Sequence, residues 1–123
     1  MSEIVLLFAL LFVKHFLFDY PLQTASELRY KGNFGDPRGA WHSYKHMAGT
    51  MVIFACLTPL WAFYGLLDLF THYLIDLTKV KLSRGLTPAD KRFWNLLGLD
   101  QLFHNLVYLL MVVIFIYFRN RGL

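Results

Sequence analysis

Residues 99–118 read LDQLFHNLVYLLMVVIFIYF, a stretch that is polar at its start and almost wholly apolar afterwards. About 20 apolar residues are enough for a helix to cross the hydrocarbon core of a bilayer. Asp100, Gln101 and His104 stand at the beginning of this stretch, and Arg119 follows its end. The stretch therefore predicts a spanning helix whose ionisable residues gather near its two ends.

The composition extends this prediction to the whole chain. Hydrophobic residues make up 57% of the 123 residues and charged residues only 16%, unlike an ordinary soluble domain. Three further apolar segments are expected to span, at about residues 4–20, 40–57 and 60–80. We predict an all-α chain forming a single transmembrane domain over residues 1–123, an integral membrane four-helix bundle. A short interfacial helix at 88–97, ended by Gly98, is expected before the last span.

Basic residues predict the orientation of this bundle, because short loops rich in Lys and Arg stay in the cytoplasm. Nine of them fall in or beside the first and third connections: Arg29, Lys31, Arg38, Lys45, Lys79, Lys81, Arg84, Lys91 and Arg92. We expect a multi-pass protein of the cell inner (cytoplasmic) membrane with both termini outside the cytoplasm. The net charge of +4 is then explained by topology and by contact with anionic headgroups of the lipid bilayer, and no nucleic acid partner is expected.

Each of the five histidines has a histidine or an aspartate four residues away. The pairs are His15 with Asp19, His42 with His46, His72 with Asp68 and with Asp76, and His104 with Asp100. Positions four apart share one face of a helix. In the predicted topology these faces lie near the cytoplasmic ends of four helices, where they can converge as in metal sites of helix bundles. Ionisable groups among apolar helices are also candidates for function by default.

The predicted metal ligands are His15, Asp19, His46, His72, Asp76, Asp100 and His104. Asp68 stands about 12 Å along the helix from Asp76, too far for both to bind one compact site. Asp68 is expected to orient His72 without binding the metal itself. His42 is likewise expected to support the ligands without being one of them. The mixed ligands favour a divalent metal ion, with zinc, manganese or iron ahead of calcium. Magnesium is the alternative if waters supply several ligands.

Each pair also has a purely structural explanation. Asp100 could cap the last helix. His15 and Asp19 could satisfy each other, with Lys14 extending to the surface. The histidines at the start of segment 40–57 could be interfacial residues like their aromatic neighbours. The pair in the third helix fits such explanations least, because it lies deeper on one face of an otherwise apolar helix.

Four stretches of the sequence carry a family resemblance that covers nearly the whole chain: HFLFDYPLQ at 15–23, the histidines around His46, HYLIDLTK at 72–79 and LDQLFH at 99–104. The resemblance is to a family of small bacterial and phage membrane proteins catalogued as domain of unknown function 3307. It implies site residues at Asp19, Gln23, His46, His72, Asp76, Lys79, Asp100, Gln101 and His104. A looser resemblance is to inner-membrane proteins described as metal-dependent hydrolases.

The leading functional hypothesis is a metal-dependent hydrolase acting at the cytoplasmic face on a phosphate- or ester-containing substrate, with anionic lipids included. Lys79 would neutralise an anionic leaving group or headgroup, and Gln23 and Gln101 would position water or substrate. Two alternatives stay open. One is a metal or proton transporter or channel component, which the nearly bare outer half disfavours. The other is a non-catalytic interaction protein that assembles as a homo-oligomer or with a membrane complex.

Overall fold

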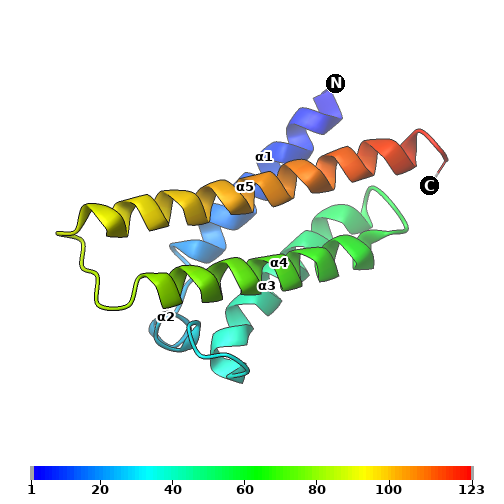
Figure 1. The fold of residues 1–123 in the computed structure, drawn as a ribbon. Coiled ribbons are helices and arrows are strands. Elements are labelled where there is room, and N and C mark those ends of the chain that lie inside the picture. The colour runs from blue at the N-terminus through cyan, green and yellow to red at the C-terminus, as the bar shows by residue number, and fades with distance from the viewer. Residues whose placement is uncertain (1, 123) are drawn as a thin grey trace.

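Every regular element among the described residues, 2–122 of this computed structural model, is an α-helix. The helices are α1 (Ser2–Asp19), α2 (Ala25–Tyr30), α3 (Pro37–Ala55), α4 (Trp61–Leu82) and α5 (Lys91–Arg119) (Figure 1). The predicted all-α class is confirmed. The first three predicted spans begin and end within three residues of α1, α3 and α4.

The four long helices are arranged so that the chain reverses at each connection. α3 and α4 form a hairpin across a short turn, and α1 and α5 pack beside them. Both termini and the α3–α4 turn lie at one end of the molecule, whereas α2 and the α4–α5 connection lie at the other (Figure 1). The end of α1 and the start of α3 therefore approach the end of α4.

The prediction of a separate interfacial helix at 88–97 broken at Gly98 is wrong, because α5 runs without interruption from Lys91. Asp90 precedes the helix and accepts a hydrogen bond from the Thr87 amide at 2.7 Å. A lone glycine costs a helix only about 1 kcal/mol relative to alanine, and the leucines on both sides of Gly98 are good helix formers. Pro88 accordingly stays in the turn before the helix.

The short helix α2 is fixed by a capping box. Thr24 Oγ1 accepts from the Glu27 amide at 3.2 Å, and the Glu27 carboxylate accepts from the Thr24 amide at 2.6 Å. Lys45 of α3 donates to the same carboxylate at 2.7 Å. Burial alone would raise the pKa of Glu27, but the bonds from Lys45 and Thr24 outweigh it and hold the pKa below its usual range. This carboxylate ties α2 to α3.

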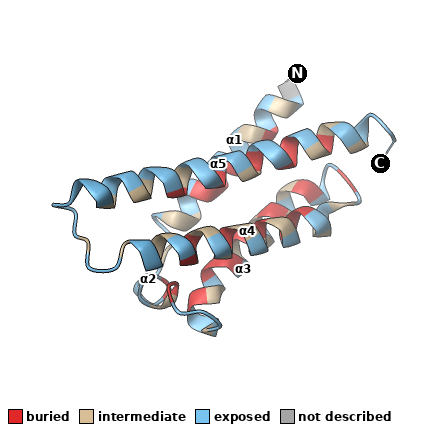
Figure 2. Ribbon diagram, in the orientation of Figure 1, coloured by how far each residue is buried: buried red, intermediate tan, exposed pale blue. Residues whose placement is uncertain are grey.

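The interior is divided into an apolar part and a polar part. The apolar core, on the side of the bundle toward the chain termini, consists of Leu7, Leu11, Phe54, Tyr64, Tyr108, Met111, Val112 and Phe115. Among the described residues, fourteen buried side chains are polar or charged and nine are hydrophobic. Many large hydrophobic side chains are exposed instead, and the buried positions form inward-facing stripes (Figure 2). This distribution is the reverse of a soluble domain.

One of the described helices, α5, is long enough and apolar enough to cross a membrane. α1, α3 and α4 each carry ionisable side chains that are buried inside the bundle. Those side chains reduce the apolar character of each helix while leaving its outer face hydrophobic.

Candidate metal centre

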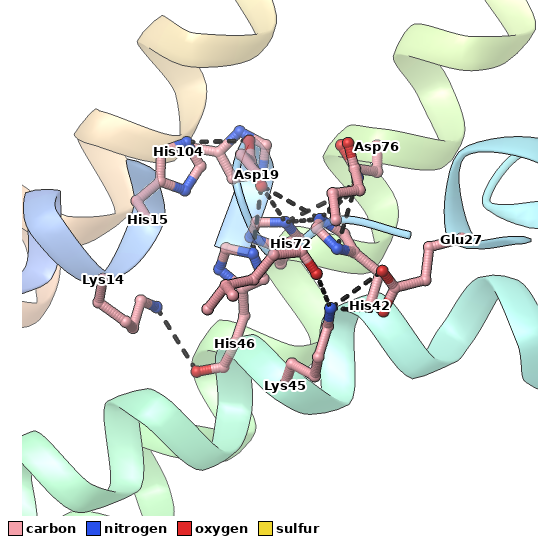
Figure 3. A network of polar contacts seen from close by, with 12 residues as sticks. Lys14, His15, Asp19, Glu27, His42, Lys45, His46, His72, Asp76 and His104 are labelled. Carbon is pink, nitrogen blue, oxygen red and sulfur yellow. Dashed lines mark hydrogen bonds and ion pairs between the residues drawn. The ribbon is translucent and has the colours of Figure 1, made fainter. Parts of the chain in front are cut away.

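Histidine and aspartate side chains from four helices meet at the polar part of the interior (Figure 3). We call the following residues the His/Asp cluster: His15 and Asp19 of α1, His42 and His46 of α3, His72 and Asp76 of α4, and His104 of α5. The ring centroid of His72 lies 4.2 Å from that of His104 and 5.7 Å from that of His15. One centre can therefore be reached from all four helices.

Asp19, the last residue of α1, is the hub of the cluster. Its Oδ1 accepts a hydrogen bond from His42 Nε2 at 3.1 Å and lies 3.1 Å from His46 Nε2 and 3.6 Å from His72 Nε2. Its Oδ2 lies 3.2 Å from His15 Nε2. A single carboxylate thus faces imidazoles from α1, α3 and α4.

Two overlapping sets of side chains have the spacing of metal ligands. In each set one ligand atom per residue lies within 4.8 Å of the others. The first set is Asp19, His42, His46 and His72, and the second is His72, Asp76 and His104. Since His72 belongs to both, the two sets form one continuous centre.

Many polar atoms of this centre lack a hydrogen-bond partner among the described residues, although they are buried. They are both ring nitrogens of His46, Nδ1 of His72, Nε2 of His104, both carboxylate oxygens of Asp76, and Oδ1 of Asp100. An unsatisfied buried polar group costs about 1–3 kcal/mol, and native proteins have few of them. Imidazole nitrogens and carboxylate oxygens without thiolates fit a divalent cation such as zinc, manganese or iron.

A family model matches residues 7–121, which include the whole His/Asp cluster. The chain belongs to the family described as Protein of unknown function (DUF3307). The resemblance to domain of unknown function 3307 that was inferred from the sequence is thereby confirmed. No curated protein and no solved structure matches the chain.

Two predicted ligands, His15 and Asp100, lie beside the two ligand sets and belong to neither. His15 Nε2 can donate to Gln101 Oε1 at 3.1 Å, and its Nδ1 can accept from the Tyr108 hydroxyl at 3.2 Å, so both nitrogens have partners. The backbone carbonyl of Asp100 accepts from His104 Nδ1 at 2.8 Å. Because a carbonyl only accepts, His104 Nδ1 carries the proton and its Nε2 is free to act as a ligand.

Two predicted supporting residues, His42 and Asp68, lie in different positions from those expected. His42 was predicted to stand behind the ligands, but its Nε2 lies within the first ligand set, 3.3 Å from His72 Nε2. Asp68 was predicted to orient His72, but their closest approach is 4.0 Å, and Asp68 instead pairs with Lys14 at 2.5 Å. A carboxylate at this depth needs a cation, and the i, i+4 spacing could not reveal that another helix supplies one.

Lys14 also differs from its prediction, because it is buried instead of extending to the surface. Its Nζ donates to Asp68 and, at 2.9 Å, to the Thr50 hydroxyl, and Thr50 donates in turn to Asp68. The side chain passes over Gly49, where a Cβ atom would stand 2.9 Å from Lys14 Cδ. We call Lys14, Thr50 and Asp68 the buried ion-pair group, and all of its charges are paired.

The three residues predicted to handle substrate, Gln23, Lys79 and Gln101, line one cavity of about 380 Å³. Asp19 and Asp100 border the same space, so the cavity opens beside the His/Asp cluster. We call it the polar cavity. Its amides and its ammonium group can bind oxygen atoms of a substrate, as the sequence hypothesis requires.

Two residues of the site escaped the sequence prediction. Lys31 is buried, lines the polar cavity and lies 3.5 Å from Asp76 Oδ2, although it had been counted only as a loop cation. With its amide turned to satisfy both neighbours, Gln23 accepts from Lys31 at 3.3 Å. Tyr108 follows His104 by four residues, so the same helical spacing could have found it; no local signal marks Lys31.

Proposed function

We propose that the chain is a metal-dependent hydrolase built into a membrane, acting at the cytoplasmic face on a phosphate- or ester-containing substrate. One observation carries the proposal. Ring nitrogens and carboxylate oxygens without hydrogen-bond partners converge beside a cavity that holds two lysines and two glutamines. This is the combination expected where an ion and an oxygen-rich substrate meet.

The two ligand sets would hold one or two divalent ions, through Asp19, His42, His46 and His72 and through His72, Asp76 and His104. A bound ion would lower the pKa of water and polarise a phosphate or ester oxygen. The Asp100 carbonyl keeps His104 in the tautomer that a ligand needs. Tyr108 and Gln101 hold the His15 ring at the border of the site.

The polar cavity would bind and orient the substrate. Lys79 and Lys31 present ammonium groups to anionic oxygens, and Gln23 and Gln101 present amides that donate and accept hydrogen bonds. Holding the reacting group beside the cluster converts an encounter in solution into a positioned reaction.

The membrane location is part of the proposal and is supported by the reversed burial pattern and by helix length. At 1.5 Å per residue, α1, α3 and α4 are about 27–33 Å long, close to the roughly 30 Å of a hydrocarbon core. α5 is about 43 Å long, so its first turns would extend past the core into the interface. We propose four spans in the inner membrane, with both termini outside the cytoplasm and α2 on the cytoplasmic side.

The apolar core favours a hydrolase over a transporter. Leu7, Leu11, Phe54, Tyr64 and Phe115 are all buried together, between the buried ion-pair group and the end of the bundle where the termini lie. A path for ions through the bundle would need polar groups at this level. The site would accordingly be open to one side of the membrane.

The test is elemental analysis by mass spectrometry on protein purified in detergent. Wild type is compared with His72→Ala and Asp76→Ala, and with Thr71→Ala as the control, because the Thr71 hydroxyl bonds only carbonyls of its own helix. We expect near-stoichiometric metal in wild type and control and its loss in both cluster variants. Hydrolysis of phosphoesters should be lost in the same two variants. Absence of metal from wild type after reconstitution with zinc, manganese and iron would refute the proposal.

A further inference from the structure

Three cavities follow one another along the seam between α4 and α5. The polar cavity shares Lys79 and Asp100 with a second cavity of about 300 Å³. The second cavity is lined by Leu74, Ile75 and Thr78 of α4 and by Leu96, Leu99 and Phe103 of α5. A third, of about 380 Å³, shares three of these side chains and continues to Leu110. We call the second and third cavities together the α4–α5 groove.

The α4–α5 groove is apolar and opens on the outside of the bundle. Leu74, Leu99, Phe103 and Leu110 on its border are each about half exposed. From Leu99 to Leu110 it extends about 16 Å along α5. The polar cavity and the α4–α5 groove together therefore form one space. Its polar end lies beside the His/Asp cluster, and its apolar part would face lipid in the proposed orientation.

A cation without a partner stands where the two parts meet. Among the described residues, Lys79 makes no direct ion pair, although the Asp100 carboxylate borders the same two cavities. Lys31, in contrast, faces Asp76 directly, and Lys45 faces Glu27. An unpaired ammonium group at the border of an apolar groove is suited to a phosphate that carries a hydrocarbon chain. A water-soluble phosphoester has no hydrocarbon chain to place in the groove.

We propose that the substrate is a membrane lipid, with its anionic phosphate headgroup in the polar cavity beside Lys79 and its hydrocarbon chain in the α4–α5 groove. This inference rests on the proposed function and adds the class of substrate and its route. The lipid enters sideways from the cytoplasmic leaflet, between α4 and α5. Its phosphate then reaches the cluster without leaving the membrane.

A second surface groove provides the control. A hollow of about 560 Å³ between α1 and α3 is lined by apolar side chains that include Val13. The two lysines that border it, Lys14 and Lys45, are already paired with Asp68 and Glu27. This hollow is larger than either cavity of the α4–α5 groove, yet it offers no unpaired cation, so it should bind lipid without regard to headgroup charge.

The experiment counts lipids retained by the detergent-purified protein in native mass spectrometry, with metal loaded and with metal removed. The probes are dioleoyl phosphatidic acid and dioleoyl phosphatidylcholine. We expect wild type to retain phosphatidic acid about tenfold better than phosphatidylcholine, which is the effect of one charge-assisted contact. Lys79→Gln should abolish that preference. Ile75→Trp and Leu99→Trp should fill the groove from either side and reduce the selective retention of phosphatidic acid, whereas Val13→Trp should leave that selectivity unchanged.

Two results would overturn the inference. One is equal retention of the two lipids by wild type. The other is an equal loss of selective retention in Val13→Trp and in both groove variants, all shown by size-exclusion chromatography to be folded. Retention of phosphatidic acid by protein that never binds metal would refute the proposed hydrolase alone. Metal binding and cleavage of nitrophenyl phosphate without selective retention would refute the lipid substrate alone.

Discussion

The two parts of the interior differ in how completely their polar groups are satisfied. Among the described residues, one buried polar atom of the apolar core lacks a partner, the Tyr64 hydroxyl, against several in the His/Asp cluster. In the apolar core, Phe54 and Tyr64 stack with their ring centroids 3.9 Å apart and their planes 5° apart. In the His/Asp cluster, several buried nitrogens and oxygens lack a hydrogen-bond partner among the described residues. The apolar core therefore stabilises the fold through packing. The unsatisfied groups of the cluster destabilise it, as is common in preorganised functional sites.

The buried ion-pair group lies between these two parts and clarifies the difference. Lys14, Thr50 and Asp68 are as deeply buried as the histidines, yet their charges and hydroxyl are matched within the group. Burial of polar residues alone thus does not identify a site. Unsatisfied hydrogen-bonding capacity separates the cluster, which we assign to function, from the ion-pair group, which we assign to structure.

The largest expected effect is on the buried ion-pair group. Lys14→Met should lower the free energy of unfolding by about 3–5 kcal/mol, because Asp68 would remain buried without its cation. The double variant Lys14→Met with Asp68→Leu should recover most of this loss. Denaturant titration of the purified protein in one detergent measures both. A loss below about 1 kcal/mol in the single variant would mean that the pair is not buried as described.

The next largest effects are expected from one substitution in the apolar core and one in the His/Asp cluster, each measured for stability and for metal content. Phe54→Ala should cost about 3 kcal/mol by leaving a cavity against Tyr64, with metal content unchanged. His46→Ala should abolish metal binding but change the stability of the metal-free protein by less than about 1 kcal/mol, since neither ring nitrogen makes a hydrogen bond and Nε2 faces only the Asp19 carboxylate, which His42 also binds. If His46→Ala destabilises the metal-free protein as much as Phe54→Ala does, the cluster is structural.

The sequence predicted those structural features whose pattern of residues lies within a single helix. The i, i+4 pairs of histidine and aspartate identify helix faces, and those faces converge in the structure because an apolar helix can bury them only against one another. The bounds of α1, α3 and α4 followed equally well from the length of the apolar segments. The single continuous α5 was missed because Gly98 was read as a break, although one glycine is too weak a signal against its helical neighbours.

Pairings between distant segments could not be predicted from one sequence. Lys14 and Asp68 are 54 residues apart, and nothing local shows that α1 brings one to the other. Lys31 is placed by α2, whose attachment to α3 depends on Glu27 and Lys45. The sequence thus predicted most residues of the cluster, with Asp100 in place of His42 among the ligands, but the cations around it depend on packing between helices.

A smaller effect is expected on α2 as the pH is lowered. The pKa of Glu27 is below that of an ordinary carboxyl group, so its stabilisation is complete above the ordinary value of about 4.3 and declines as the pH falls through the lowered pKa. The loss should be on the order of 1 kcal/mol and confined to α2 and its contact with Lys45. Hydrogen exchange between pH 6 and pH 3 measures it, with Glu27→Gln as a reference that should show no such step. A step of equal size in Glu27→Gln would assign the effect to another group.

The smallest expected effect is a gain in stability at Gly98. A Cβ atom there meets nothing within 4 Å, so Gly98→Ala should raise the free energy of unfolding by about 1 kcal/mol if α5 is continuous. Gly65→Ala is the control, because its Cβ would stand 2.3 Å from Met51 Cγ and should destabilise the α3–α4 contact. Both changes are measured by denaturant titration under the same conditions. A loss of stability in Gly98→Ala would instead indicate a break at this residue, and would separate the first turns of α5 from the part that carries Asp100 and Gln101 of the polar cavity and packs on the apolar core.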